Sequence, residues 1–111
     1  MEGGGVELLL YRTASGDCPV RAWLESLDAQ VEALVAKRFD RVRRGLFGDT
    51  KLLGGGVWEL KIDVGPGYRI YYGLDGPRVV VLLCAGQKDA QERDIARARA
   101  YWESHLRQKG L

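Results

Sequence analysis

The chain has 111 residues, of which 46% are hydrophobic and 29% are charged, and its formal net charge is +2. This length suits a single domain over residues 1–111, and the composition supports a packed core and excludes a disordered chain. The longest apolar run, Val79 to Ala85, is about a third of a membrane-spanning helix. No basic, apolar leader opens the sequence, so we expect a cytoplasmic protein without a membrane partner, with flexible ends at residues 1–5 and 108–111.

The cysteine and glycine patterns predict neither a metal site nor a cofactor. Cys18 and Cys84 show no CxxC spacing, so we expect free thiols in a reducing compartment. The Gly65-Pro66-Gly67 turn lacks the lysine and the following helix of a phosphate-binding loop. We therefore expect no bound metal, no nucleotide and no cofactor.

The first half of the chain predicts one strand followed by two helices. Residues 6–13 alternate apolar side chains between two faces, as a strand does. Pro19 begins a short helix that runs to about Leu27, and Asp28 caps a longer helix that ends at Gly45. Residues 46–56 are rich in glycine and predict a loop.

The second half predicts a three-stranded antiparallel meander followed by a helix. Strands at residues 57–64 and 68–74 flank a glycine turn, and the unbroken apolar strand at 78–85 is expected to be central and buried on both faces. A C-terminal helix covers about residues 90–107, with an apolar stripe of Ile95, Ala98, Trp102 and Leu106. The predicted fold class is α+β, with a helical hairpin on one face of a small sheet.

The register of the predicted hairpin follows from its apolar residues. The core face must hold one set of side chains, namely Trp58, Leu60, Ile62, Ile70 and Tyr72. A three-residue loop achieves this by placing Val64 opposite Tyr68. The same register puts two pairs on the other face, Asp63 with Arg69 and Lys61 with Tyr71. We therefore expect an open, cation-bearing surface on the face away from the core.

Basic residues gather between Lys37 and Lys51, where six cations stand against two carboxylates. Arg41, Arg44 and Lys51 are candidate contacts to RNA phosphates. A solvated face of an amphipathic helix explains the same charges, and it is the commoner interpretation of such a run.

Three motifs indicate a family. They are LFGD at Leu46 to Asp49, GPGYR at Gly65 to Arg69, and a K-D-x-Q-x-R-D-I pattern at Lys88 to Ile95. Together, within a similarity that spans about Val6 to Tyr101, they resemble the "addiction module killer" subgroup of the RelE/ParE toxin superfamily, close to phage-derived HigB-like toxins.

The resemblance implies the toxin of a type II toxin–antitoxin system. It implies a sheet with a cupped face that binds RNA and metal-independent cleavage of mRNA on translating ribosomes. It also implies a cognate antitoxin, expected to be a helix-turn-helix protein, that covers this face in a toxin–antitoxin hetero-oligomer.

The resemblance also assigns candidate catalytic residues. Metal-free RNA cleavage must remove a proton from the 2′-hydroxyl, stabilise a charged phosphorane and protonate the 5′-oxygen. Arg69 matches the family's arginine and would clamp the phosphate. Lys61 matches a lysine position and would be the general base, since neighbouring cations favour its neutral form. Lys88 would neutralise charge or assist the leaving group.

Alternatives stay open at these positions. A cross-strand salt bridge to Asp63 is an equal interpretation of Arg69, and both roles hold if Asp63 orients the guanidinium. The sequence lacks the tyrosine that RelE toxins carry after the last strand, so Tyr71 is either the substitute phenol or ordinary strand packing. His105, near the end of the last helix, is expected to interact with that helix end or with solvent.

Two other functions remain open. ParE-like members of the superfamily act on DNA gyrase without catalysis, and the missing tyrosine favours that reading; the fold alone does not separate the two activities. The third alternative is an inactive phage-derived module that only binds an antitoxin.

Overall fold

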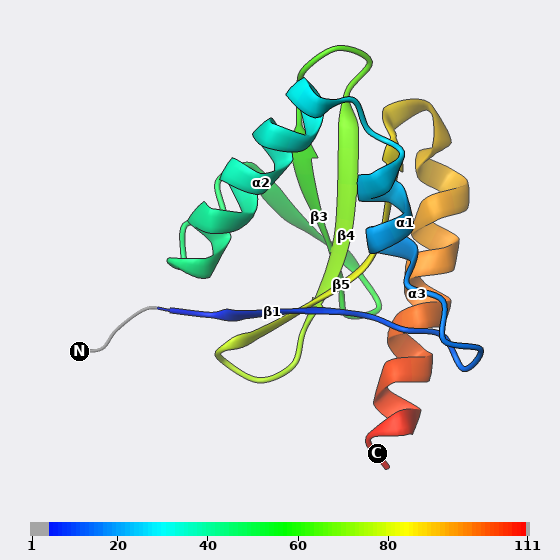
Figure 1. Ribbon diagram of the computed structural model, residues 1–111. Coiled ribbons are helices and arrows are strands. Elements are labelled where there is room, and N and C mark those ends of the chain that lie inside the picture. The colour runs from blue at the N-terminus through cyan, green and yellow to red at the C-terminus, as the bar shows by residue number, and fades with distance from the viewer. Residues whose placement is uncertain (1–4, 111) are drawn as a thin grey trace.

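The computed structural model describes residues 5–110, which form a mixed α+β fold as predicted (Figure 1). The strands are β1 (Glu7–Leu10), β2 (Thr50–Gly54), β3 (Val57–Ile62), β4 (Tyr68–Leu74) and β5 (Val79–Gln87). The helices are α1 (Pro19–Glu25), α2 (Ala29–Arg43) and α3 (Gln91–Gln108), with a short 3-10 turn, η1 (Lys88–Ala90), before α3. The expected flexible ends at residues 1–4 and 111 lie outside the described residues, whereas Gln108 belongs to α3.

The five strands form one sheet in the order β1-β5-β4-β3-β2. β1 is parallel to β5, and the other neighbours are antiparallel. The predicted meander is therefore present as β3, β4 and β5, and β5 is an interior strand buried on both faces, as expected.

Within residues 5–110, no helix combines the length and apolar character that crossing a membrane requires.

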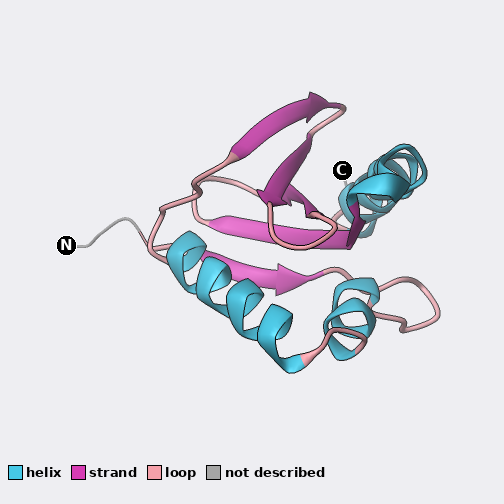
Figure 2. Cartoon of the chain, turned by 90° about the horizontal axis from the view of Figure 1, so that it is seen from above, coloured by secondary structure: helices cyan, strands magenta, loops and turns pink. Residues whose placement is uncertain are grey.

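Helices cover both faces of the sheet, as Figure 2 shows from above. α1 and α2 bury Val20, Val35, Phe39 and Val42 on one face, together with Leu60, Ile70 and other apolar residues of the sheet. On the other face, Ala98 and Trp102 of α3 pack on a second apolar cluster. The predicted helical hairpin packs on one face of the sheet, but its layout differs from the expectation: α1 and α2 diverge from their connecting turn (Figure 1), and α1 packs against β5.

The helix starts follow local chemistry. Pro19 occupies the first turn of α1, where its missing N–H costs no hydrogen bond. The Asp28 carboxylate accepts the Val31 N–H at 3.0 Å and caps α2, as predicted. This cap fixes where α2 begins, and so which of its residues, Val35, Phe39 and Val42, face the sheet.

The β3–β4 hairpin has the predicted faces but a different register. Ile62, and not Val64, lies opposite Tyr68. β3 ends early because residues 63–67 form a wider loop, in which Gly67 has φ of 84° and donates its N–H to the Val64 carbonyl at 3.0 Å. The shift is even, so the predicted apolar set still packs on one face.

The corrected register changes the pairs on the other face. Lys61 lies opposite Arg69, and Tyr71 lies opposite Glu59. Asp63 has left the strand and belongs to the loop. The expected pairings of Lys61 with Tyr71 and of Asp63 with Arg69 as strand partners are therefore wrong.

The segment at residues 46–56 contains a strand where the sequence predicted only a loop. β2 pairs with β3, and Thr50 Oγ1 bonds both the Glu59 carbonyl and the Tyr72 hydroxyl at 2.7 Å. Lys51 and Leu52 are exposed because β2 is an edge strand. A short edge strand beside three glycines shows little alternation, which explains the prediction of a loop.

α3 covers the sheet face that was expected to be open. The predicted stripe is confirmed, since Ala98 and Trp102 are buried and Ile95 and Leu106 pack beside them. A Cβ at Gly73 would lie 2.3 Å from the Trp102 ring, so the helix sits directly on β4. On this face of β3 and β4, Glu59, Arg69 and Tyr71 are therefore buried, whereas Lys61 remains half-buried.

Candidate functional site

Three of the four predicted catalytic residues lie together at one end of the α3 face. Lys61 on β3 is directly opposite Arg69 on β4, so their side chains share this face. Lys88 begins η1, just after β5, and its N–H bonds the Gly67 carbonyl at 2.9 Å. A Cβ at Gly67 would lie 3.4 Å from Lys88 Cβ and 3.6 Å from Arg69 Nη1. We call Lys61, Arg69 and Lys88 the cation cluster.

Arg69 is the anchored member of the cation cluster. Its side chain is only 4% exposed, so the expectation that it lies on an open surface is wrong. Nη1 donates to the Tyr68 carbonyl at 2.9 Å and to the Asp63 carboxylate at 3.2 Å, and Nε is buried without a partner among the described residues. The predicted salt bridge to Asp63 is confirmed, although the loop and not the strand supplies it.

Lys61 and Lys88 are more accessible than Arg69. Lys61 is half-buried between β2 and β4, and Lys88 is exposed. The cluster therefore combines one fixed guanidinium with two ammonium groups that reach solvent. Such a set suits an anion that approaches from outside and is held at its inner end by Arg69.

Buried polar residues that sequence reasoning missed lie deeper under α3. Glu59 is 0% exposed, and Gln91 of α3 donates to its carboxylate at 2.8 Å. Asp94 of α3 is 2% exposed and accepts from Arg97 at 3.2 Å. The sequence offered one signal, a charged residue in the middle of β3, but strand alternation indicated that it faces solvent.

Tyr71 belongs to this interior and not to an open surface. It is 0% exposed, and its hydroxyl has no partner within residues 5–110. Burial, and next the Glu59 carboxylate, raise the pKa of Tyr71 above its ordinary value. The expectation of an outward phenol is wrong, and the geometry agrees with the alternative of strand packing.

The predicted RNA-binding residues do not form one patch. Arg41 is exposed on α2 and borders two cavities on the opposite side of the sheet from α3. Arg44 is the C-cap of α2 and lies outside the lining of both cavities. Lys51 lies opposite Glu59, so its side chain is on the α3 face.

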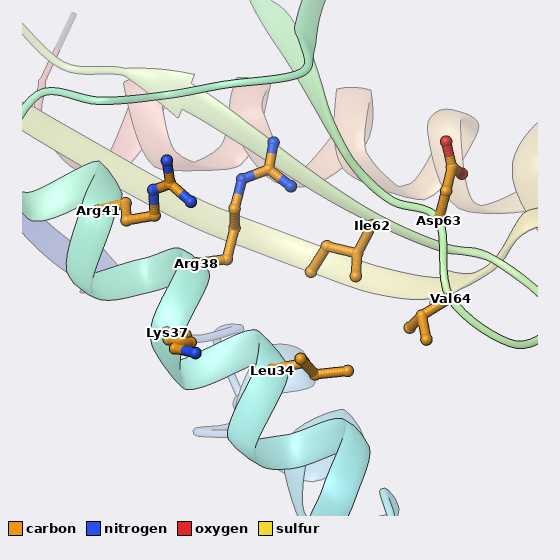
Figure 3. A pocket seen from close by; sticks show the side chains of 7 residues that line it. All are labelled: Leu34, Lys37, Arg38, Arg41, Ile62, Asp63 and Val64. Carbon is orange, nitrogen blue, oxygen red and sulfur yellow. The ribbon is translucent and has the colours of Figure 1, made fainter.

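The first cavity lies between α2 and the end of β3 and has a volume of about 270 Å³. Figure 3 shows Arg38 and Arg41 extending from α2 toward the strand, with Ile62 across from them. Its full lining is Leu34, Lys37, Arg38, Arg41, Ile62, Asp63 and Val64. Asp63 therefore lines this cavity and also bonds Arg69 of the cation cluster.

Arg38 shapes this region, although the sequence did not single it out. Its Nη2 donates to the Phe47 and Asp49 carbonyls at 3.0 and 3.1 Å, and its Nη1 donates to the Lys61 carbonyl. Burial lowers the pKa of Arg38. Because its donors are committed to main-chain carbonyls, Arg38 ties the 46–49 loop and β3 to α2 and has little capacity left for a ligand.

His105 lies away from the cation cluster. It bonds the Asp75 carboxylate at 2.9 Å, just beyond the far end of β4 from Arg69. Within residues 5–110, no three His, Cys, Asp or Glu side chains come together in an arrangement that would hold a metal ion.

Comparison with known proteins matches the chain to a family and to a relative. Residues 22–103 match the family described as phage derived protein Gp49-like (DUF891). An uncharacterized protein of Haemophilus influenzae is 39% identical over 79 residues, which cover 70% of this chain and 80% of that protein. The family match spans α2, β2 to β5 and most of α3, and so includes the whole cation cluster.

Proposed function

Since the chain belongs to the Gp49-like phage-derived family, we propose that it is the toxin of a type II toxin–antitoxin pair and that it cleaves mRNA on translating ribosomes without a metal ion. Within this assignment we place it in the HigB-like subgroup of the RelE/ParE superfamily, on the LFGD, GPGYR and C-terminal motifs. The family supports the toxin role. The proximity of Lys61, Arg69 and Lys88 at one end of the sheet supports RNA as the target, because neighbouring cations suit a phosphodiester.

We assign each residue of the cation cluster a role in cleavage from its exposure and its position. Arg69, held by the Tyr68 carbonyl, would stabilise the charge that develops on the phosphorane oxygens. Lys61, its direct cross-strand neighbour, would accept the 2′-hydroxyl proton. Lys88, exposed at the start of η1, would neutralise charge or donate a proton to the 5′-oxygen. Tyr71 has no part in this proposal because its hydroxyl does not reach solvent.

The remaining predicted cations would contact the RNA backbone away from the cut. Arg41 lies on the other side of the sheet from Arg69 and borders the cavity that Asp63 also lines, so RNA bound at Arg69 would reach it by passing around the loop that holds Asp63. Lys51 and Arg44 would each add a phosphate contact at greater distance. Contacts of this kind raise affinity without selecting sequence, and they weaken as salt is added.

We further propose a helix-turn-helix antitoxin as the partner. An acidic or amphipathic segment of it would neutralise the cation cluster or displace an element that supports it. Co-expression with the neighbouring gene should then restore growth, and the two proteins should purify together. A chain that is well tolerated at high level without any partner would argue against this proposal.

Induction of the protein in a bacterial host, followed by primer extension on several mRNAs, tests the activity. Growth arrest with new 5′ ends inside coding regions is the expected result. Growth arrest with broken chromosomal DNA and intact mRNA would instead identify a gyrase-directed toxin. Unaffected growth would indicate an inactive antitoxin-binding module.

A further inference from the structure

Asp63 is an exposed carboxylate bound to a buried arginine. Its side chain is 67% exposed, whereas that of Arg69 is 4% exposed. The pair joins Asp63 Oδ1 to Arg69 Nη1 at 3.2 Å. The carboxylate therefore reaches Arg69 from the solvent side.

The guanidinium is held in place without Asp63. Nη1 also donates to the Tyr68 carbonyl at 2.9 Å, which fixes it to the main chain of β4. Nε is buried and has no partner among the described residues, so the donors of Arg69 are not all satisfied. A carboxylate oxygen and a phosphate oxygen are equivalent acceptors for such a donor.

Asp63 also lies where a phosphate would approach. It borders the 270 Å³ cavity whose opposite wall includes Lys37 and Arg41 (Figure 3). A phosphate that arrives from solvent meets the exposed Asp63 carboxylate before it meets the buried Arg69 guanidinium. Because the Asp63 side chain is exposed, a change of rotamer is enough to release Arg69.

We propose that Asp63 is a built-in competitor for phosphate at Arg69. An RNA phosphate displaces the carboxylate and takes its place on Nη1, so Asp63 lowers and thereby sets the affinity for RNA. The inference rests on the proposed role of Arg69 as an RNA phosphate clamp. It differs from an orienting role for Asp63, in which loss of the carboxylate would weaken binding.

The substitution Asp63→Asn keeps the shape of the side chain and removes its charge. The matched control is Asp40→Asn, because Asp40 is 71% exposed and bonds Arg43 at 2.8 Å on α2, outside the cluster. Two probes are titrated against the full chain, inorganic phosphate and a short RNA with 2′-O-methyl groups that cannot be cleaved. The Arg69 Nε–H signal in NMR spectra reports binding at the site itself.

Asp63→Asn should bind both probes about fivefold more tightly than the parent, and Asp40→Asn should change binding by less than about twofold. In an Arg69→Lys background the gain from Asp63→Asn should fall to the level of the control. Weaker binding by Asp63→Asn, or a gain no larger than that of Asp40→Asn, would overturn the inference. Tighter phosphate binding by Asp63→Asn from a parent that cleaves no mRNA would leave the inference standing and refute the proposed function.

Discussion

The face of the sheet that packs on α1 and α2 and the face that packs on α3 bury different chemistry. The first buries apolar and aromatic side chains, among them Leu60 and Ile70. The second is apolar around Trp102 but buries Glu59, Arg69 and Asp94 toward the start of α3. Burying charges costs free energy unless each is well paired. The first face therefore stabilises the fold. The charges buried at the polar end of the second face reduce that stability, and this is where we locate the activity.

The largest expected effect comes from placing a charge on the apolar face. Ile70→Asp should destabilise the fold by several kcal/mol, on the order of the whole stability of a small domain, because Ile70 is 0% exposed. Ile70→Val is the control and should cost about 1 kcal/mol. Urea unfolding measures both, and an Ile70→Asp protein as stable as the parent would contradict this description of the face.

A substitution at the apolar end of the α3 face should destabilise the fold less than Ile70→Asp does. Gly73→Ala would place a methyl group 2.3 Å from the Trp102 ring, so α3 must shift away from β4. Overpacking of this kind typically costs about 1–3 kcal/mol. Thermal melting checks the loss, and an unchanged melting temperature would mean that α3 is not seated on β4 as described.

The polar end should lose activity rather than stability. Lys61→Ala removes a half-buried cation and Lys88→Ala removes an exposed one, so the melting temperatures of both variants should stay near that of the parent. Each should reduce RNA cleavage by about tenfold, which is less than the loss expected for Arg69, because water can share proton transfer. Full activity of both variants would remove the two lysines from the mechanism.

The smallest expected effect on stability concerns Asp75, which bonds His105 and Lys109 at the C-terminal end of α3. A hydrogen bond from Lys109, and a second from His105, lower the pKa of Asp75. The stabilisation is therefore present above the ordinary Asp pKa of about 4, and it is lost as the pH falls through the lowered value. The parent should melt slightly above Asp75→Asn at pH 7, and the difference should shrink as the pH drops below about 4. A difference that is independent of pH would contradict an ionic anchor.

The sequence predicted the parts of the fold that repeat a strong local signal. The Asp28 cap, the β3 and β4 faces and the α3 stripe all follow from periodicity or capping chemistry and are confirmed. The register failed because the loop after Ile62 is held by contacts that strand alternation does not describe: the Gly67 carbonyl accepts from Lys88 outside the hairpin, and the Asp63 carboxylate bonds the Arg69 side chain. β2 was missed because an edge strand needs only one half-buried face.

For the site, sequence similarity indicated the residues, and the structure gave their surroundings. Lys61, Arg69 and Lys88 are brought together as the resemblance implied, although their part in catalysis stays a prediction. The burial of Arg69 and Tyr71 was not predictable from strand alternation, because alternation describes one hairpin and not the helix that covers it. Glu59 was missed for the same reason, since its partner Gln91 lies 32 residues away.

The most direct measurement of the central claim is the rate of mRNA cleavage on ribosomes by Arg69→Lys. This substitution keeps the charge and most of the buried volume but removes the planar fork that holds two oxygens. Arg43→Lys, an exposed arginine paired with Asp40, is the matched control. We expect Arg69→Lys to remain folded and to cleave about 10² to 10³ times more slowly, with the control unchanged. A folded Arg69→Lys protein that cleaves as fast as the parent would contradict the assignment of the cation cluster as the active site.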